Sequence, residues 1–180
     1  MVTKLTFRPV TKANHKDFET LFGMPSAPKY CWCMAYRATP EEVKEPKSSD
    51  RHRHMLGRIK DGVPVGLVGY VAGEPVAWVS IAPRDTYHRL GVPAEDDRKV
   101  WSLVCMYARR EIRGQGVAHQ LIKAAIAHAK KHKADVVEAY PVAPDSPSYR
   151  FMGFVPASER AGFRQVGMAG TRRHIMRLTL

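Results

Sequence analysis

Two glycines one residue apart, Gly114 and Gly116, precede an alanine-rich stretch in the sequence REIRGQGVAHQLIKAAIAHAKKHK. Apolar residues recur across 117–132 at the spacing of one helix face, which predicts a helix that begins near Gly116. The N–H groups of its first turn have no partner inside the helix, and the helix dipole adds partial positive charge there. Glycines allow an anion to approach these groups closely, and Arg113 adds a planar cation. The stretch therefore predicts an anion-binding site.

A second unusual segment, YCWCMAYR at residues 30–37, holds two of the three cysteines. The C-x-C spacing of Cys31 and Cys33 is compatible with zinc, but a zinc site needs about four ligands and the chain has no second pair. We therefore expect no metal site. The apolar neighbours of these cysteines indicate a buried patch, in which Trp32 belongs either to the core or to the lining of a pocket.

The formal net charge of +12 favours an anionic partner, which could be nucleic acid, a membrane surface or a phosphorylated cofactor. The basic residues are spread along the chain, so charge alone does not choose among these partners. No stretch approaches the roughly 20 apolar residues that span a bilayer, and the first residues lack the apolar run of a signal peptide. Together with the odd number of cysteines, these features predict a cytoplasmic protein without a membrane partner.

Alternating and periodic patterns predict the elements that must position the glycine-rich stretch. An apolar strand at 99–108, the helix at 117–132 and a strand at 134–142 form a β-α-β unit, whose two strands should be parallel. Thr11 and Thr39 are each candidate N-cap residues at the start of a helix. The remaining predictions are a strand at 4–10, helices from Thr11 to about Phe22 and from Thr39 to Pro46, a helix at 48–62, a hairpin at 65–82, a helix at 156–161 and strands at 163–167 and 172–180.

The glycine-rich stretch lacks the patterns of two other phosphate-binding loops: it has no G-x-x-x-x-G-K-[ST] string and no third glycine for a dinucleotide fingerprint. It resembles instead the [QR]-x-x-G-x-[GA] acetyl-CoA signature of the GNAT superfamily of N-acetyltransferases, and the predicted element order resembles that superfamily too. The resemblance implies one domain over residues 1–180 with an α/β GNAT fold. Such a fold has a mixed, mostly antiparallel central sheet, a β-α-β unit that binds acetyl-CoA, and helices on both faces. The residues in the signature are Arg113, Gly114, Gln115, Gly116, Val117 and Ala118.

The same resemblance implies how acetyl-CoA, as co-substrate, would bind and react. The signature residues would hold its pyrophosphate, while Met106, Tyr107 and Ala108, at the end of the preceding strand, would hold the pantetheine arm. A backbone N–H in this strand end would polarise the thioester carbonyl. An amine would attack the thioester directly, without an acyl-enzyme intermediate, so neither Cys31 nor Cys33 is needed as a nucleophile.

The protonation roles have two alternatives. Members of the superfamily often place a tyrosine that acts as the acid four residues before a Gly-Phe pair, and the pair at 153–154 assigns this position to Tyr149. The pair at 162–163 assigns it to Ser158 instead, and fits the tail better because one strand, a turn and one strand remain. We keep Tyr149 as the candidate acid and Glu138, on the following strand, as the candidate base.

The contacts and class of the acceptor follow less directly. Trp32 and Tyr87 are the candidate acceptor contacts, and the acceptor is a small-molecule or peptide amine whose identity the sequence leaves open. A basic nucleic-acid-binding module is an alternative, but the chain lacks a helix-turn-helix pair, a zinc finger and an aromatic RNA-binding signature. A GNAT-like sensor that binds acyl-CoA without catalysis is another. Many members of the superfamily form homodimers, so a homodimer is one expected assembly.

Overall fold

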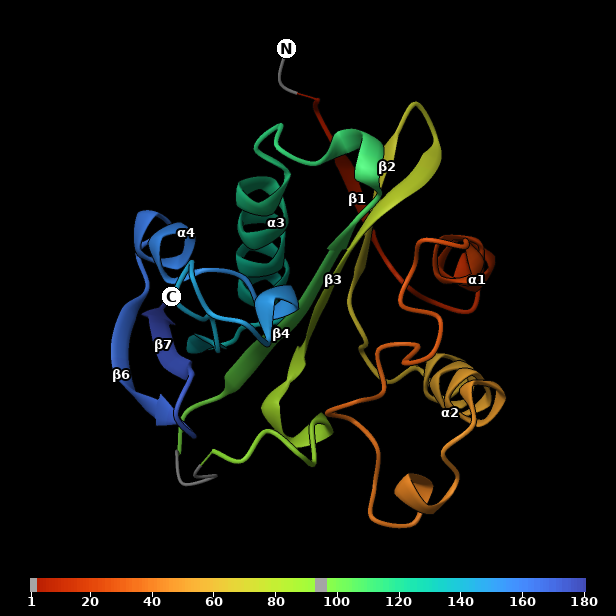
Figure 1. Ribbon diagram of the computed structural model, residues 1–180, viewed down its shortest axis with the longest axis horizontal. Coiled ribbons are helices and arrows are strands. Elements are labelled where there is room, and N and C mark those ends of the chain that lie inside the picture. The colour runs from red at the N-terminus through yellow and green to blue at the C-terminus, as the bar shows by residue number, and fades with distance from the viewer. Residues whose placement is uncertain (1–2, 93–96) are drawn as a thin grey trace.

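Seven strands form one twisted sheet in the computed structural model, which describes residues 3–92 and 97–180. Their order across the sheet is β1-β2-β3-β4-β5-β7-β6, and β4 and β5 are the parallel neighbours among otherwise antiparallel pairs (Figure 1). The predicted mixed, mostly antiparallel sheet is therefore confirmed. The strands are β1 (Thr6–Pro9), β2 (Leu67–Val71), β3 (Glu74–Pro83), β4 (Val100–Ala108), β5 (Val136–Ala139), β6 (Arg164–Ala169) and β7 (Arg173–Thr179).

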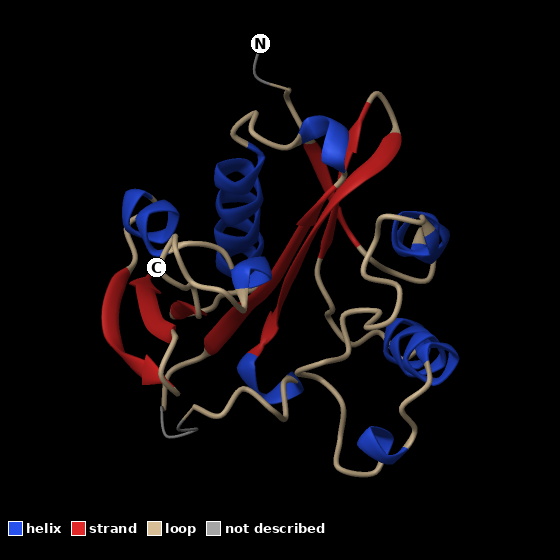
Figure 2. Cartoon of the chain, in the orientation of Figure 1, coloured by secondary structure: helices blue, strands red, loops and turns tan. Residues whose placement is uncertain are grey.

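Helices cover both faces of the sheet, as predicted. Figure 2 shows α1 and α2 on one side of the strands and α3 and α4 on the other. Within the described part of the chain, no helix has the length and apolar character needed to cross a bilayer. The helices are α1 (His15–Gly23), α2 (Ser48–Lys60), α3 (Val117–Lys131) and α4 (Val155–Arg160), with 3-10 turns η1 (Glu42–Lys44), η2 (Arg84–Thr86), η3 (Arg110–Ile112) and η4 (Arg150–Met152).

The core is divided by the sheet into two apolar layers. On one face, the buried Trp78 of β3 packs against the rings of Phe18 and Phe22 of α1, with ring centroids 5.0 and 5.7 Å away. On the other face, Val79 belongs with Leu121 of α3 to a second buried cluster. Neighbouring residues of a strand point to opposite faces, so β3 and β4 join both layers.

Two predicted helix starts differ from the structure. The first helix begins at His15 rather than at Thr11, because the Thr11 N–H donates to Asn14 Oδ1 (2.7 Å) in a turn that precedes the helix. At Thr39 the capping box does form: its N–H donates to Glu42 Oε2 (2.9 Å), and the Glu42 N–H donates to Thr39 Oγ1 (3.3 Å). Only the single turn η1 follows, because Pro46 disfavours helical backbone in the residue before it.

An aromatic cluster joins the C-terminal half of α3 to β4. The ring centroid of Trp101 lies 4.9 Å from that of His132 and 5.5 Å from that of His128. Partial burial, together with the nearby His132, lowers the pKa of His128 to about 4. His128 is therefore neutral in the folded protein at a pH where an unfolded chain already binds a proton.

Replacement of His128 by glutamine is expected to reduce the pH dependence of stability. As the pH falls from 6.5 toward 4, the unfolded state binds the proton first, so the free energy of unfolding decreases across this window. The decrease should be smaller in His128→Gln, as measured by urea denaturation at a series of pH values. His119→Gln, at an exposed position of the same helix, is the matched control. If the free energy of unfolding has the same dependence on pH in wild type and His128→Gln, the lowered pKa assigned to His128 is wrong.

Candidate functional site

The parallel strands β4 and β5 separate in the middle of the sheet. Their pairing ends at Leu103 and Ala139, whereas β4 continues to Ala108. A bulge lies at the same point, because Ser80 of β3 pairs with Cys105 and the next residue, Ile81, pairs with Leu103. The bulge changes which face the following side chains point to. Leu103 belongs to the buried layer beneath α3, whereas Cys105 belongs to the layer beneath α1 and α2.

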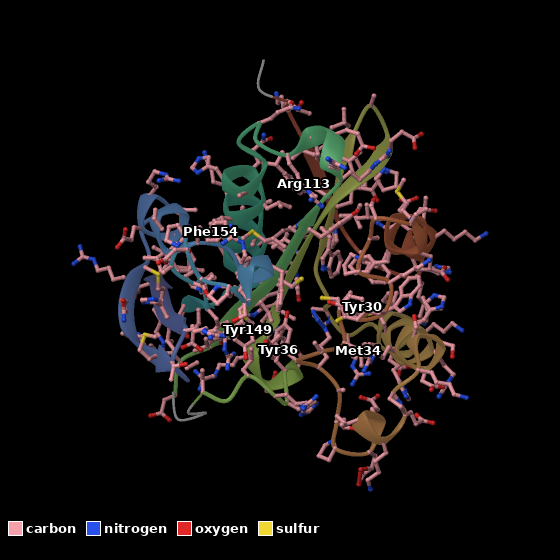
Figure 3. The ribbon with its side chains drawn as sticks, viewed as in Figure 1. Tyr30, Met34, Tyr36, Arg113, Tyr149 and Phe154 are labelled. Carbon is pink, nitrogen blue, oxygen red and sulfur yellow. The ribbon has the colours of Figure 1, made fainter. Side chains whose placement is uncertain are left out.

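A cavity of about 790 Å³ lies where the strands separate. Residues Val104–Ala108 of β4 form its floor, and residues between 26 and 36, in the turns after α1, form one wall. Arg150, Phe151 and Phe154 form the opposite wall, and Arg113 lies at one end. Figure 3 shows the labelled side chains of Arg113, Phe154, Tyr36 and Tyr30 arranged around this space. The floor therefore includes Met106, Tyr107 and Ala108, the three strand residues predicted to bind the co-substrate.

The glycine loop adopts a backbone that favours glycine at both positions. Gly114 has φ +76° and Gly116, the N-cap of α3, has φ +73°, both in the left-handed region. A Cβ atom added at Gly114 would meet nothing within 4 Å. Within the described residues, the N–H groups of Gly114, Gln115 and Gly116 have no acceptor. Open space, free N–H groups and the N-terminus of a 15-residue helix together suit an anion.

Side chains of the loop hold its backbone in place. The Arg113 Nε donates to the carbonyl of Ala108 (2.8 Å), and its guanidinium lies 5.9 Å from the centre of the Tyr107 ring. The Gln115 side chain donates to the carbonyl of Glu111 (3.1 Å) and also accepts a hydrogen bond from the hydroxyl of Thr3. These contacts leave the backbone N–H groups, rather than the Gln115 side chain, for a ligand.

The two helical residues of the signature differ in exposure. Val117 is buried in the layer between α3 and the sheet, where it fixes the start of the helix. Ala118 is exposed, and its small side chain leaves the helix N-terminus accessible.

Two tyrosines in the cavity lining retain their protons at neutral pH. Burial raises the pKa of Tyr87 to about 12, and its hydroxyl lies 2.8 Å from Ser80 Oγ. Tyr36 is half-buried, and burial raises its pKa as well. Tyr87, which was predicted to contact the acceptor, is one of the residues that line the cavity. Tyr36 was not among the predicted site residues, although it lies in the unusual segment 30–37.

Tyr149 lies beside the cavity rather than in its lining. Its backbone is left-handed (φ +59°), and its side chain is exposed. It neighbours Tyr36 in Figure 3, and the guanidinium of Arg173 lies 5.4 Å from the Tyr149 ring and 5.6 Å from the Tyr36 ring. Ser158, the alternative at this position, is buried on α4. After α4 the chain forms β6 and β7, which is the strand, turn and strand expected after the Gly-Phe pair at 162–163.

Glu138 is enclosed in an ion-pair network. Its side chain is 1% exposed, and Oε2 accepts a hydrogen bond from Nε of Arg177 at 2.6 Å. Oε1 accepts a hydrogen bond from the Tyr140 hydroxyl (2.7 Å) and lies 3.5 Å from the Arg84 guanidinium. Both oxygens are thus engaged, and Glu138 is absent from the described lining of the cavity. This environment argues against the predicted role as a base and for a structural one.

Trp32, a predicted acceptor contact, packs in the core and is not among the described residues that line the cavity. Its ring stacks on His52 with centroids 4.0 Å apart, and it lies 6.0 Å from the Phe22 ring. Its Nε1–H donates to Ser48 Oγ at the start of α2 (3.1 Å). Of the two alternatives for Trp32, the structure supports the core, because the ring packs with Phe18 and Phe22 of α1 and His52 of α2.

A polar cluster behind the cavity floor escaped the sequence analysis. Arg37 is 1% exposed and donates to Ser80 Oγ and to the Tyr87 hydroxyl, each at 2.9 Å. Cys33 and Cys105 lie in the same region and line the cavity. The unusual segment 30–37 signalled the cysteines, but its contacts with β3 and β4 depend on the folded chain. Among the described residues, no group of three His, Cys, Asp or Glu side chains could hold a metal ion.

Comparison with known proteins provides an independent finding. A sequence model described as the acetyltransferase (GNAT) family matches residues 24–154. No curated protein sequence matches the chain.

Several solved structures resemble the whole fold. A ribosomal-protein-alanine N-acetyltransferase from Brucella melitensis is 23% identical, with a TM-score of 0.59, over 97% of this chain and 99% of that one. The PaiA N-acetyltransferase from Thermoplasma acidophilum, in complex with coenzyme A, is 15% identical, with a TM-score of 0.58, over 98% and 99% of the two chains. The aminoglycoside acetyltransferase AAC(6')-Ib, in complex with coenzyme A, is 16% identical, with a TM-score of 0.64, over 98% and 95%. At these identities the similarity demonstrates a shared fold.

Proposed function

The chain belongs to the GNAT family of acetyltransferases, and from this premise we propose that it transfers the acetyl group of acetyl-CoA to a primary amine by direct attack. The observation that carries the proposal is the separation of β4 from β5 over a cavity that ends at Arg113, the residue before Gly114. A thioester donor has a long arm and an anionic end, and this site offers a groove for the first and free N–H groups for the second.

The donor fits the described residues as follows. The pyrophosphate of acetyl-CoA would lie on the N–H groups of Gly114, Gln115 and Gly116, where an added Cβ at Gly114 meets open space. Arg113 is exposed beside this loop and supplies positive charge. The pantetheine arm would run along the free edge of β4, past Ala108, Tyr107 and Met106. Val117 and Ala118 would contribute the start of α3, whose dipole favours the phosphates.

Catalysis would depend mainly on positioning and on the backbone of β4. A backbone N–H beyond Leu103 can donate to the thioester carbonyl oxygen, where negative charge develops as the amine attacks. Binding both reactants in one cavity removes most of the entropic cost of their encounter. The departing CoA thiolate needs a proton, and we propose Tyr36 rather than Tyr149 as its source, because Tyr36 lines the cavity and burial keeps it protonated.

The glycine loop can be tested by acetyl-CoA titration in a calorimeter. Gly114→Glu should abolish the micromolar binding expected of the wild type, because the new carboxylate would occupy and repel the pyrophosphate site. Gly73→Glu is a matched control: Gly73 is also left-handed (φ +86°) and also has open space around an added Cβ, but lies in the β2–β3 turn. Equal losses in the two variants would indicate backbone strain instead of phosphate contact.

The acid can be identified by removing single hydroxyl groups. Tyr36→Phe should lower kcat by about 100-fold, the lower range for loss of a general acid, while the KM for acetyl-CoA changes little. Tyr149→Phe removes the same group from the neighbouring exposed ring and should stay within a few-fold of wild type. The measurement is release of CoA thiol with an amine acceptor. A loss confined to Tyr149→Phe would restore the assignment made from the sequence.

The charge of the cavity indicates the kind of amine it accepts. Its lining contains Arg113 and Arg150 together with the rings of Tyr30, Tyr36 and Phe151, and no carboxylate is found among its described residues. A polycationic acceptor would meet the like charge of Arg113 and Arg150 with no described carboxylate in the lining, whereas an aromatic or apolar amine would meet ring faces. We propose a small-molecule or peptide amine with an aromatic or apolar body and at most one positive charge.

A panel of acceptors tests this preference. Tyramine and a peptide with an N-terminal aromatic residue should be acetylated with kcat/KM at least about tenfold higher than spermidine or kanamycin, a difference of about 1.4 kcal/mol. Arg150→Gln should reduce this difference in kcat/KM, because it removes one cation from the cavity wall. Faster acetylation of spermidine or kanamycin by the wild type would refute the electrostatic argument.

A further inference from the structure

A buried arginine behind the cavity floor has only neutral hydrogen-bond partners among the described residues. Arg37 donates to Ser80 Oγ, to the Tyr87 hydroxyl and to the carbonyl of Val65, and its guanidinium lies 4.5 Å from the centre of the Tyr87 ring. Burial of a cation is costly unless an anion compensates it. Arg58 illustrates the usual solution in this chain, because Glu42 accepts two hydrogen bonds from it, at 2.7 and 2.8 Å.

The sulfur of Cys33 is the group that can supply the compensating negative charge. Cys33 lies in the lining of the cavity, and Nε1–H of Trp78 donates to its Sγ at 3.3 Å. Cys105 lines the same cavity, and the buried Arg37 donates to Ser80, the residue of β3 that pairs with Cys105. A hydrogen-bond donor on the sulfur and a buried cation nearby are features that favour a thiolate.

The backbone keeps this sulfur in place. Trp32 and Cys33 are consecutive residues with left-handed backbone, φ +46° and +57°. Such a conformation is unfavourable in a residue other than glycine. Strain of this kind persists only where the surrounding contacts enforce it, and it often marks functional positions. Here the buried Trp32 ring and the contacts of the Cys33 sulfur enforce the turn that aims the thiol at the cavity.

The three cysteines at the cavity differ in acidity. The hydrogen bond from Cys105, helped by the charge of Arg37, lowers the pKa of Cys33 below its usual range. Sharing of this hydrogen bond and burial raise the pKa of Cys105, and burial raises that of Cys31. Among the described residues, the titratable or charged groups that interact with Cys33 include Cys31, Arg37, Cys105 and Tyr87, and of these four Arg37 favours the anion by its charge.

We propose that Cys33 is a thiolate at neutral pH and accepts the proton that the attacking amine loses. The location supports this role, because Cys33 lines the same cavity as Cys105, the first residue of β4 beyond the bulge, where the thioester carbonyl is proposed to bind. The inference rests on the proposed function, since a proton acceptor at this place requires the transfer reaction.

The step balances without another reactant. The amine nitrogen forms a bond to the carbonyl carbon, and the bond from that carbon to the CoA sulfur breaks with its electron pair on sulfur. The amine proton moves to Sγ of Cys33, which becomes a neutral thiol, while the CoA thiolate takes a proton from the Tyr36 hydroxyl. Cys33 then loses its proton, and Tyr36 regains one, through solvent. The products are the amide and free CoA.

The charge of Cys33 can be measured without an activity assay, because thiolates absorb ultraviolet light and their absorbance can be followed during a pH titration of the intact protein. Wild type and Cys31→Ser should both show one thiolate at pH 7, well below the ordinary thiol pKa of about 8.5, and Cys33→Ser should lose that signal. Cys33→Ala is a second variant in case the serine protein does not fold. A wild type without thiolate at pH 7, or an unchanged signal in Cys33→Ser, would overturn the proposal.

The proton-transfer role is tested by acetyl transfer across the same pH range. Wild-type kcat/KM should fall at low pH with the midpoint of the thiolate titration, and Cys33→Ser should lose at least about 100-fold at neutral pH, with partial recovery as the pH rises. The matched variant Cys31→Ser, which removes a neighbouring thiol but leaves Cys33, should still show the low-pH fall in kcat/KM. Wild-type rates in Cys33→Ser would overturn the base role alone.

Two further outcomes separate this inference from the proposed function. Failure of the wild type to acetylate any amine in the panel would refute the proposed function and with it the base role, whereas the absorbance titration would still report the charge of Cys33. An acetyl group on Cys33 after incubation with acetyl-CoA, detected by mass spectrometry, would identify a nucleophile and overturn the base role.

Discussion

The parting of two parallel strands is the constraint around which the site is organised. Beyond Leu103 and Ala139, the facing edges of β4 and β5 no longer satisfy each other's N–H and C=O groups. Buried backbone groups need partners, so a free strand edge inside a protein is stable mainly where a ligand or water reaches it. The bulge at the same point turns Cys105 toward the layer beneath α1 and α2. The strand separation and the bulge together open the cavity, which under the proposed function would receive the long arm of the donor and the reacting groups.

The chain handles buried charge in two contrasting ways. Glu138 forms ion pairs with Arg177 and Arg84, and this network joins β5 to β7 and η2 behind the site. Arg37 has no such carboxylate among the described residues, and its field instead extends through hydroxyl groups toward the cavity. The ion pairs of Glu138 join parts of the fold, but their charges cancel and leave little electrostatic potential to affect a reaction. Arg37, which has no carboxylate partner among the described residues, retains a positive potential at the neighbouring thiols. Under the proposed function, this residue could affect the reaction without contacting the reactants.

Local patterns predicted the frame of the molecule better than its chemistry. The periodicity of 117–132 and the apolar run at 99–108 identified the β-α-β unit and the glycine loop, because each depends on neighbouring residues. The start signal at Thr39 formed its capping box but not a full helix, since Pro46 limits what can follow. Cys33, Arg37 and Ser80 are close only after the wall segment folds against β3, and no local pattern encodes that contact. The positions of Trp32 and Glu138 depended on similar long-range packing.

The wall formed by residues 26–36 has a consequence for how the protein could diversify. This segment consists of turns rather than strands, and a few contacts, such as the Ser48 hydroxyl on the carbonyl of Lys29, tie it to α2. The β4 edge and the glycine loop belong to the sheet and α3 instead. Mutations at exposed wall positions such as Tyr30 and Ala35 can therefore alter the shape of one half of the cavity while the other half keeps its backbone. Under the proposed function, the part of the cavity that would bind the donor and the wall that would contact the acceptor are separate segments, so changes in a single loop could alter the acceptor without altering the donor site.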